Sequence, residues 1–457
     1  MPPLLVQCSV CLAIWFLAVE CTPAIERGPA GEHAAVTDSS TLKTSTRRLT
    51  LDEFLAGVAA NNLDLAAQRY NISIAQAQLV AAKVSPNPVF AVNFNKEISR
   101  RDQATQYSEG LTEEIEVAGK RRFRVSVAQK NLLSVSATVD DFFRTVRGTA
   151  ATAFVAALSG QLTVDEKRRA FEALNDLATA NEKRLGEGDL GEADANQSRL
   201  AAKQAEGDLV VAQSAQSANL FALVQLLGKK RATVPNPEGN LLFPNKDLSL
   251  GSILAVAMQN RPDVRAARFA LQSAQSSVKL AKANRIPDPT IGVIVGETGR
   301  ITSQIDPAPS YNTLNLSLSI PLPLFNSYRG EYEAAVQTAL QAQKLLESVE
   351  LKADVDVRTN FDRYQLAKQQ LSKYQGNAIE LARKVLEAKL TSYRLGAVPL
   401  LDVLQAEKDD TDVHLNYITA LTERASSLVA LEQAAGFWDI KLPPGQSISN
   451  IQPAFAR

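Results

Sequence analysis

The stretch 392–407, SYRLGAVPLLDVLQAE, interrupts a long helical pattern with Gly396 and Pro399. Because glycine costs about 1 kcal/mol and proline about 3 kcal/mol in a helix interior, this stretch is predicted to be a reversal between two helices. The stretch 184–199, RLGEGDLGEADANQSR, places Gly188 208 positions before Gly396. The same interval relates Asp194 to Asp402, Gln197 to Gln405, Leu223 to Leu431, Gln225 to Gln433 and Gly228 to Gly436. The chain is therefore predicted to contain one unit twice.

Three segments with a helical period of apolar residues occur in each half. They span 50–84, about 120–187 and 190–228 in the first half, and 249–285, about 330–395 and 400–436 in the second. At 1.5 Å per residue, each long segment would reach roughly 100 Å, and the two shorter segments of a half would together reach a similar length. Each half is therefore predicted to be a long helix that reverses at the glycine and returns through two shorter helices.

Two stretches with the alternation of β-strands lie between the first and the long helical segment of each half. They cover about 90–97 and 111–117, then about 291–297 and 313–321. In the last stretch, Leu316 and Leu318 face one side and Ser317 the other. A soluble surface hairpin is the alternative, but such a hairpin usually carries large charged side chains on its outer face. Glu113 fits a lipid-facing position only near a membrane edge.

Four strands cannot close a barrel, and open edges in lipid would leave backbone hydrogen-bonding groups unpaired. Closure therefore requires several copies, and three copies would supply twelve strands, an even number within the usual range.

The N-terminus carries an apolar run followed by small residues, which is typical of a secretory signal, although it lacks the usual early Lys or Arg. A buried core helix is the alternative. All three cysteines, Cys8, Cys11 and Cys21, lie in this segment. Cys21 is a candidate lipidation site, but Glu20 departs from the small residue expected before a lipidated cysteine. The predicted organisation is a signal at 1–21, a leader or linker at 22–48, repeats at 49–228 and 248–436, a linker at 229–247 and a tail at 437–457.

The composition argues against several classes of function. Lysine plus arginine and aspartate plus glutamate each number 49, so no net charge indicates a nucleic-acid partner. Histidine occurs only at His33 and His414, and methionine only at Met1 and Met258, so neither a metal site nor a cofactor is expected. His414 is expected on a solvated helix surface. No Walker A stretch, nucleophile elbow or catalytic triad is present, so the chain is not expected to be an enzyme.

The residues resemble those of the TolC-type outer-membrane efflux duct family over roughly 49–437. The resemblance depends on the duplicated order, the paired SPNP (85–88) and IPDP (286–289), the stretch IEVAGKRRFR (115–124) and the two glycine-containing reversals. The GKRR form resembles the branch that serves heavy-metal exporters of the cobalt–zinc–cadmium type.

The resemblance implies a mainly α fold with a small β part. Duplicated long-helix hairpins would form a periplasmic α-barrel, and four strands per chain would contribute to a trimeric, 12-stranded outer-membrane β-barrel. The implied function is a passive channel of a tripartite efflux system. Its partners would be two further copies, a periplasmic adaptor (membrane fusion) protein, an inner-membrane RND-type pump and outer-membrane lipid. A drug-efflux or type I secretion duct is an alternative within the family, and a periplasmic coiled-coil adaptor or scaffold is an alternative of another class.

The resemblance also implies two groups of site residues. The adaptor-docking tips would comprise Arg184, Leu185, Gly188, Tyr393, Arg394, Leu395 and Gly396. The entrance gate would use Asp402, where threefold symmetry would bring three carboxylates near the axis. The second acid common in the family is replaced here by Gln405, and Asp409 would form a weaker ring two turns away. The gate residues start a polar helix face, which is either lumenal or an ordinary solvated surface.

Overall fold

A computed structural model describes residues 44–98, 102–228, 234–242, 248–303 and 308–438, which all lie within one compact unit, Lys43–Arg457. The predicted signal at 1–21, the lipidation candidate Cys21 and nearly all of the predicted tail at 437–457 fall outside the described residues.

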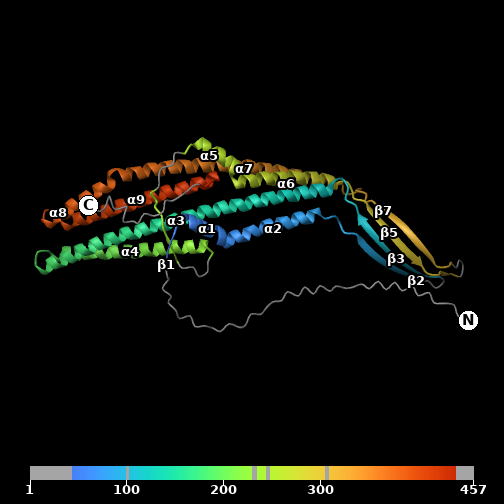
Figure 1. The fold of residues 1–457 in the computed structure, drawn as a ribbon, viewed down its shortest axis with the longest axis horizontal. Coiled ribbons are helices and arrows are strands. Elements are labelled where there is room, and N and C mark those ends of the chain that lie inside the picture. The colour runs from blue at the N-terminus through green and yellow to red at the C-terminus, as the bar shows by residue number, and fades with distance from the viewer. Residues whose placement is uncertain (1–43, 99–101, 229–233, 243–247, 304–307, 439–457) are drawn as a thin grey trace, which may run out of the picture. The chain divides into compact units, whose positions relative to one another are not determined.

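Helices dominate the described chain (Figure 1). They are α1 Leu51–Asn61, α2 Leu63–Lys83, α3 Lys120–Gly186 and α4 Glu192–Leu226 in the first half, then α5 Leu250–Asn260, α6 Pro262–Asn284, α7 Arg329–Lys373, α8 Ile379–Arg394 and α9 Leu400–Ala435 in the second. A π-helical turn, Tyr374–Ala378, joins α7 to α8, so the long helix of the second half runs without a break from Arg329 to Arg394. Both predicted long helices are confirmed to within about two residues.

The first predicted helix of each half is in fact two helices. Asn62 ends α1 in an extended conformation, and its Oδ1 accepts a hydrogen bond from Leu65 N at 2.9 Å to cap α2. In the second half the break lies at Arg261, because Pro262 occupies the first position of α6 and disfavours a helical conformation in the preceding residue. The single helices predicted over 50–84 and 249–285 were therefore wrong at these two positions.

Each of these breaks packs against a glycine that ends the returning helix of the same half. Gly228 (φ 64) follows α4, and a Cβ there would lie 2.3 Å from the carbonyl oxygen of Asn61. Gly436 (φ 70) follows α9, and a Cβ there would lie 3.1–3.3 Å from atoms of Arg261. The duplicated pair Gly228 and Gly436 therefore marks one packing device used twice.

The strands form an antiparallel sheet in the order β2-β3-β5-β7, which comprises β2 Val89–Ile98, β3 Asp102–Glu114, β5 Thr290–Thr298 and β7 Tyr311–Ser319, with β6 Thr302–Ser303 paired to the end of β3. The register places Phe90, Leu111, Val293 and Leu316 side by side on one face. Ser317 faces the other side next to Gly292. The predicted alternation in β7 is confirmed.

Strand β3 differs most from its prediction. It begins nine residues earlier than expected, because the polar stretch 103–110 pairs with β2 and Asp102 pairs with Ser303 of β6, and it ends at Glu114. Residues 115–117 leave the sheet instead, and Ile115 N donates to Pro289 O at 2.9 Å. Glu113 shares the apolar face, opposite Ile291, in the last rows of the sheet next to the helices.

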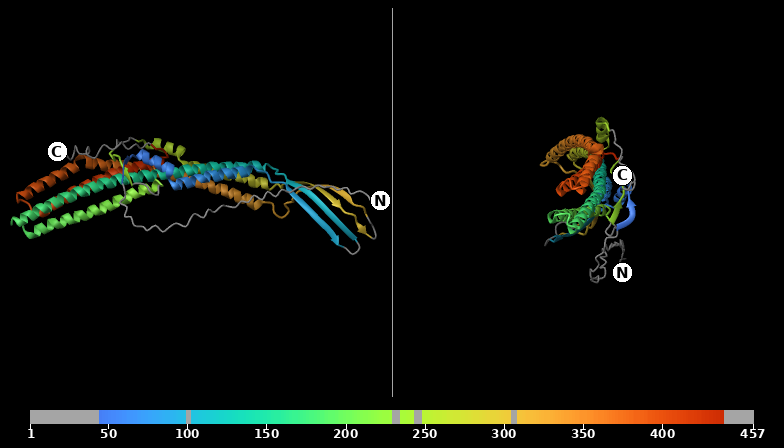
Figure 2. Two further views of the ribbon diagram at one scale, coloured as in Figure 1. Left: turned by 60° about the horizontal axis from the view of Figure 1, so that its bottom comes forward. Right: turned by 90° about the vertical axis from the view of Figure 1, so that its left-hand side faces the viewer.

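The helices that enter and leave the sheet pack in the same order as its strands. Helices α2 and α3, α3 and α6, and α6 and α7 pack pairwise, so α2 lies beside the β2 edge and α7 beside the β7 edge (Figures 1 and 2). The main apolar core lies farther along, where α1, α3, α5, α7 and α9 meet around Phe54 and Phe154, whose ring centroids are 5.6 Å apart.

Two features were not anticipated. Residues predicted as linkers supply a parallel strand pair, β1 Thr44–Leu49 with β4 Val234–Pro237, and Arg48 forms an ion pair with Glu238 at 2.9 Å beside it. Among the described residues, α4 alone is long and apolar enough to cross a membrane by length and composition. This helix packs along α3.

Candidate functional site

The two glycine stretches are confirmed as helix reversals, and both are built in the same way. Gly188 (φ 85) and Gly396 (φ 74) are left-handed, and nothing lies within 4 Å of a Cβ built at either residue, so conformation alone requires glycine here. In the first turn, Gly188 N donates to Leu185 O at 3.0 Å and Asp189 N to Arg184 O at 2.9 Å. Gly396 and Ala397 repeat this pair of bonds. Both turns are therefore Schellman caps.

The predicted docking residues differ in burial: Tyr393 is buried, Arg184 and Leu185 are half-buried, and the others are exposed. Tyr393 is 7% exposed, and its Oη donates to Oδ1 of the buried Asn181 on α3 at 3.0 Å. The Arg184 guanidinium lies 5.5 Å from the centroid of the Tyr393 ring. Leu395, by contrast, is 79% exposed. Tyr393 therefore ties the α8 tip to the α3 tip within one chain.

A small apolar core holds the returning helix at this tip. Tyr393, Leu400 and Val403 are buried together, and Leu404 packs against them. Leu400 and Leu404 thus hold the start of α9 at the tip, whereas Leu401 is 62% exposed.

The gate residues have partners within the chain. Asp402 is half-buried, and its Oδ2 accepts from Lys389 Nζ on α8 at 2.6 Å. Gln405 Nε2 donates to Asp409 Oδ1 at 2.7 Å on the exposed face of α9. A ring of Asp402 carboxylates would therefore have a positively charged lysine beside each carboxylate. The sequence did not indicate this pair, because Lys389 lies in the helix before the turn and Asp402 in the helix after it.

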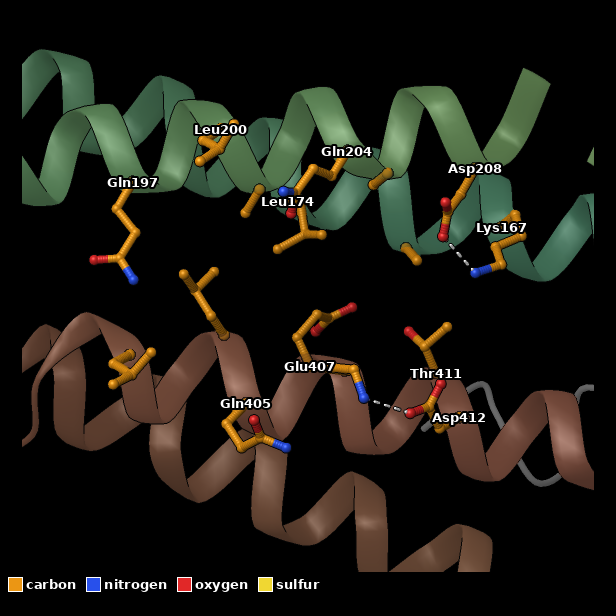
Figure 3. A pocket seen from close by; sticks show the side chains of 16 residues that line it. Lys167, Leu174, Gln197, Leu200, Gln204, Asp208, Gln405, Glu407, Thr411 and Asp412 are labelled. Atoms are coloured by element: carbon orange, nitrogen blue, oxygen red, sulfur yellow. Dashed lines mark hydrogen bonds and ion pairs between the residues drawn. The ribbon is translucent and has the colours of Figure 1, made fainter. Parts of the chain in front are cut away.

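The polar faces repeated in the two halves line one groove of about 410 Å³ (Figure 3). Gln197, Gln204 and Asp208 come from α4, and Gln405 and Asp412 from α9, with α3 as the floor. Two ion pairs lie along its walls, Lys167 with Asp208 at 2.8 Å and Lys408 with Asp412 at 3.0 Å. The equivalence read from the 208-residue interval is therefore spatial as well as sequential.

The prediction that His414 is solvated was wrong. His414 is 7% exposed, and its Nδ1 lies 3.0 Å from Oε1 of Glu166, itself 4% exposed on α3. Glu407 and Asp410 belong to the same cluster. Burial, with Asp410 and Glu166 close by, raises the pKa of Glu407 to about 7, and burial also raises the pKa of Asp410. Among the described residues, no group of three or more histidine, cysteine or acidic side chains could hold a metal ion.

Two helical hairpins tied at their tips and joined to a four-stranded sheet with one apolar face make up a fold that solved outer-membrane channels share. The solved outer-membrane channel OprN matches 87% of this chain and 95% of its own, with a TM-score of 0.73 and 18% identity. VceC of Vibrio cholerae matches 85% and 96%, with a TM-score of 0.69 and 18% identity. These matches establish the fold.

Sequence comparison agrees with the fold. The family model for outer membrane efflux proteins matches residues 253–437. The cobalt-zinc-cadmium resistance protein CzcC of Cupriavidus metallidurans is 23% identical over 391 residues, which cover 85% of this chain and 90% of the relative. The pyoverdine export outer membrane protein OpmQ of Pseudomonas putida is 27% identical over 419 residues, covering 84% and 85%. Residues 253–437 therefore match the outer membrane efflux protein family, and the chain is an outer-membrane channel with a large periplasmic part.

Proposed function

We propose that the chain is the passive outer-membrane duct of a tripartite system that exports heavy-metal cations. The proposal of heavy-metal cations as the substrate is supported by the match to CzcC, which covers 85% of this chain and 90% of the relative. The GKRR stretch at the start of α3 agrees with it. The chain would assemble as a homotrimer, dock on a periplasmic adaptor and receive its substrate from an inner-membrane RND-type pump. Energy and selectivity would come from the pump.

Deletion of the gene is the direct test. The deletion strain is expected to tolerate less cobalt, zinc or cadmium than its parent, and the full chain supplied on a plasmid should restore growth. The co-purifying pump and adaptor identify the system. Loss of siderophore export with unchanged metal tolerance would instead favour the activity named for OpmQ, which matches the chain over a similar length.

The apolar face of the sheet is proposed to contact lipid. A cysteine placed at Leu316, which is 79% exposed, should react with a thiol reagent dissolved in the lipid phase. A cysteine at the adjacent Ser317 should react only with a water-soluble reagent that enters the lumen, because neighbouring strand residues point to opposite faces. The reverse pattern of labelling would contradict the proposed orientation of the sheet.

The channel entrance is proposed to include Asp402, with Lys389 setting its charge. In single-channel recording, Asp402→Asn should lower cation selectivity, because it removes three carboxylates and leaves three lysines. Lys389→Met should raise cation selectivity for the opposite reason. The matched control is Asp409→Asn, two turns along α9, with a smaller expected change. A larger effect of Asp409→Asn than of Asp402→Asn would place the constriction farther along the helix.

A further inference from the structure

At the helical end of the sheet, a hydrogen bond and a largely buried ion pair join the two halves of the chain. Asp288 precedes β5 between two prolines, and its Oδ1 accepts from Val117 N at 2.8 Å. Its Oδ2 pairs with Lys120 Nζ at 2.7 Å, and the two side chains are only 11% and 10% exposed. Lys120, the first residue of α3, is thereby held against the segment that leads into β5, the strand next to β3 in the sheet.

The first half contains the same entry segment without this contact. Pro86, Asn87 and Pro88 precede β2 as Pro287, Asp288 and Pro289 precede β5, so Asn87 is the counterpart of Asp288. Asn87 is exposed, whereas Asp288 is largely covered. The segment next to Asn87 is also uncovered, since Val84 and Val89 are 56% and 60% exposed.

The second half contains the complementary uncovered part. A left-handed residue precedes each long helix, Gly119 (φ 72) before α3 and Tyr328 (φ 54) before α7, and the first helical residue is basic in both. Arg329 is thus the counterpart of Lys120. Its side chain is 80% exposed, whereas the Lys120 side chain is 10% exposed.

The segment that leads into α7 is apolar and exposed. Leu322 and Leu324 are 72% and 76% exposed, and Phe325 is fully exposed. This segment follows β7, at one edge of the sheet, while Asn87 precedes β2, at the other edge. The contact between residues 117–120 and Asp288 joins β3 to β5 in the middle of the sheet. At the two edges of the sheet, the equivalent segments before β2 and after β7 are each exposed and lack the other segment as a partner.

We infer that residues 322–329 of one copy pack on residues 84–89 of the next copy, which repeats the contact between residues 117–120 and Asp288 across the subunit boundary. This inference rests on the proposed assembly of several copies. Phe325 supplies the apolar anchor, and Asn326 N donates to the Asn87 side chain as Val117 N does to Asp288. The boundary lacks the full ion pair of the internal junction, because asparagine replaces aspartate.

Cysteine cross-linking tests the contact. In the full chain, Asn87→Cys with Asn326→Cys should form disulfides between copies under mild oxidation, seen as covalent dimers and trimers on a non-reducing gel. The control pair, Val117→Cys with Asp288→Cys, should form a disulfide within one chain and leave monomer-sized bands. Each single variant and the parent chain control for Cys8, Cys11 and Cys21. Size-exclusion chromatography in detergent shows whether each variant is assembled.

An assembled protein in which only the internal pair cross-links would overturn the inference but leave the proposed assembly intact. A protein that elutes as a monomer would contradict the proposed assembly itself. A second variant tests the chemistry: Asn87→Asp should raise the temperature at which the copies dissociate. It adds a carboxylate, equivalent to that of Asp288, beside Arg329, which within its own chain pairs only with the exposed Glu333 at 2.8 Å among the described residues. Arg329→Gln should cancel that gain. An unchanged or lower dissociation temperature in Asn87→Asp would also overturn the inference.

Discussion

Gly228→Ala is expected to destabilise the folded protein by about 2–5 kcal/mol, because two costs apply at one position. A left-handed conformation costs a residue with a Cβ about 1–2 kcal/mol. Overpacking adds about 1–3 kcal/mol, since the new Cβ would lie 2.3 Å from the backbone oxygen of Asn61, which no side-chain rotation relieves. The break between α1 and α2 would have to move away from the end of α4.

Gly188→Ala is the matched control for this prediction. Gly188 has φ 85, and nothing lies within 4 Å of a Cβ built there, so only the conformational cost applies. Thermal unfolding followed by circular dichroism in detergent should therefore give the order parent, Gly188→Ala, Gly228→Ala from most to least stable. Equal unfolding temperatures for the two variants would show that the packing of Gly228 against Asn61 contributes nothing.

Glu407→Gln is expected to stabilise the protein above pH 7 and to have little effect below pH 4.5. The folded-state pKa of Glu407 is about 7, against 4.5 for an ordinary glutamate, chiefly because of burial and then because of Asp410 and Glu166, with His414 acting in the opposite direction. Between these two pH values the folded state binds more protons than the unfolded state, so stability falls as pH rises. The cost is absent below pH 4.5 and reaches about 3 kcal/mol above pH 7.

Glutamine removes that cost because it matches the neutral acid in shape and carries no charge. The difference in unfolding temperature between Glu407→Gln and the parent should therefore grow from pH 4.5 to pH 7.5. Asp409→Asn serves as the control, because it removes one carboxylate from the exposed face of the same helix. A constant difference for Glu407→Gln across the range would contradict the assignment of a buried, titrating carboxyl group.

Local sequence patterns predicted the structure correctly where few residue types can adopt the required conformation. Gly188 and Gly396 marked both reversals, since few other residues adopt a left-handed cap. The alternation around Leu316 gave the faces of β7 correctly. Pro262 signalled the break between α5 and α6, although the prediction passed over it. The break at Asn62 had a weaker signal, because asparagine marks a helix start only when its side chain caps the next turn.

These local patterns could not predict contacts between residues that lie far apart in the sequence. His414 was expected in solvent because it lies next to Asp412 on a helix surface, but its partner Glu166 lies 248 residues away on α3. Lys389 compensates Asp402 from across the turn. Tyr393 was grouped with the docking residues, yet its hydroxyl bonds Asn181 on another hairpin. Each of these contacts depends on how the helices pack, which no local pattern in the sequence records.

The two open edges of the sheet also decide the order of events in biogenesis. Among the residues that the structure describes, strands β2 and β7 each end the sheet with one side of their backbone unpaired. Lipid offers no hydrogen bonds to those groups, so a lone copy inserted in the bilayer would bear the cost of every one of them. Chains must therefore meet before or during insertion, and the yield of inserted channel should depend on how many newly exported chains are present at the same time.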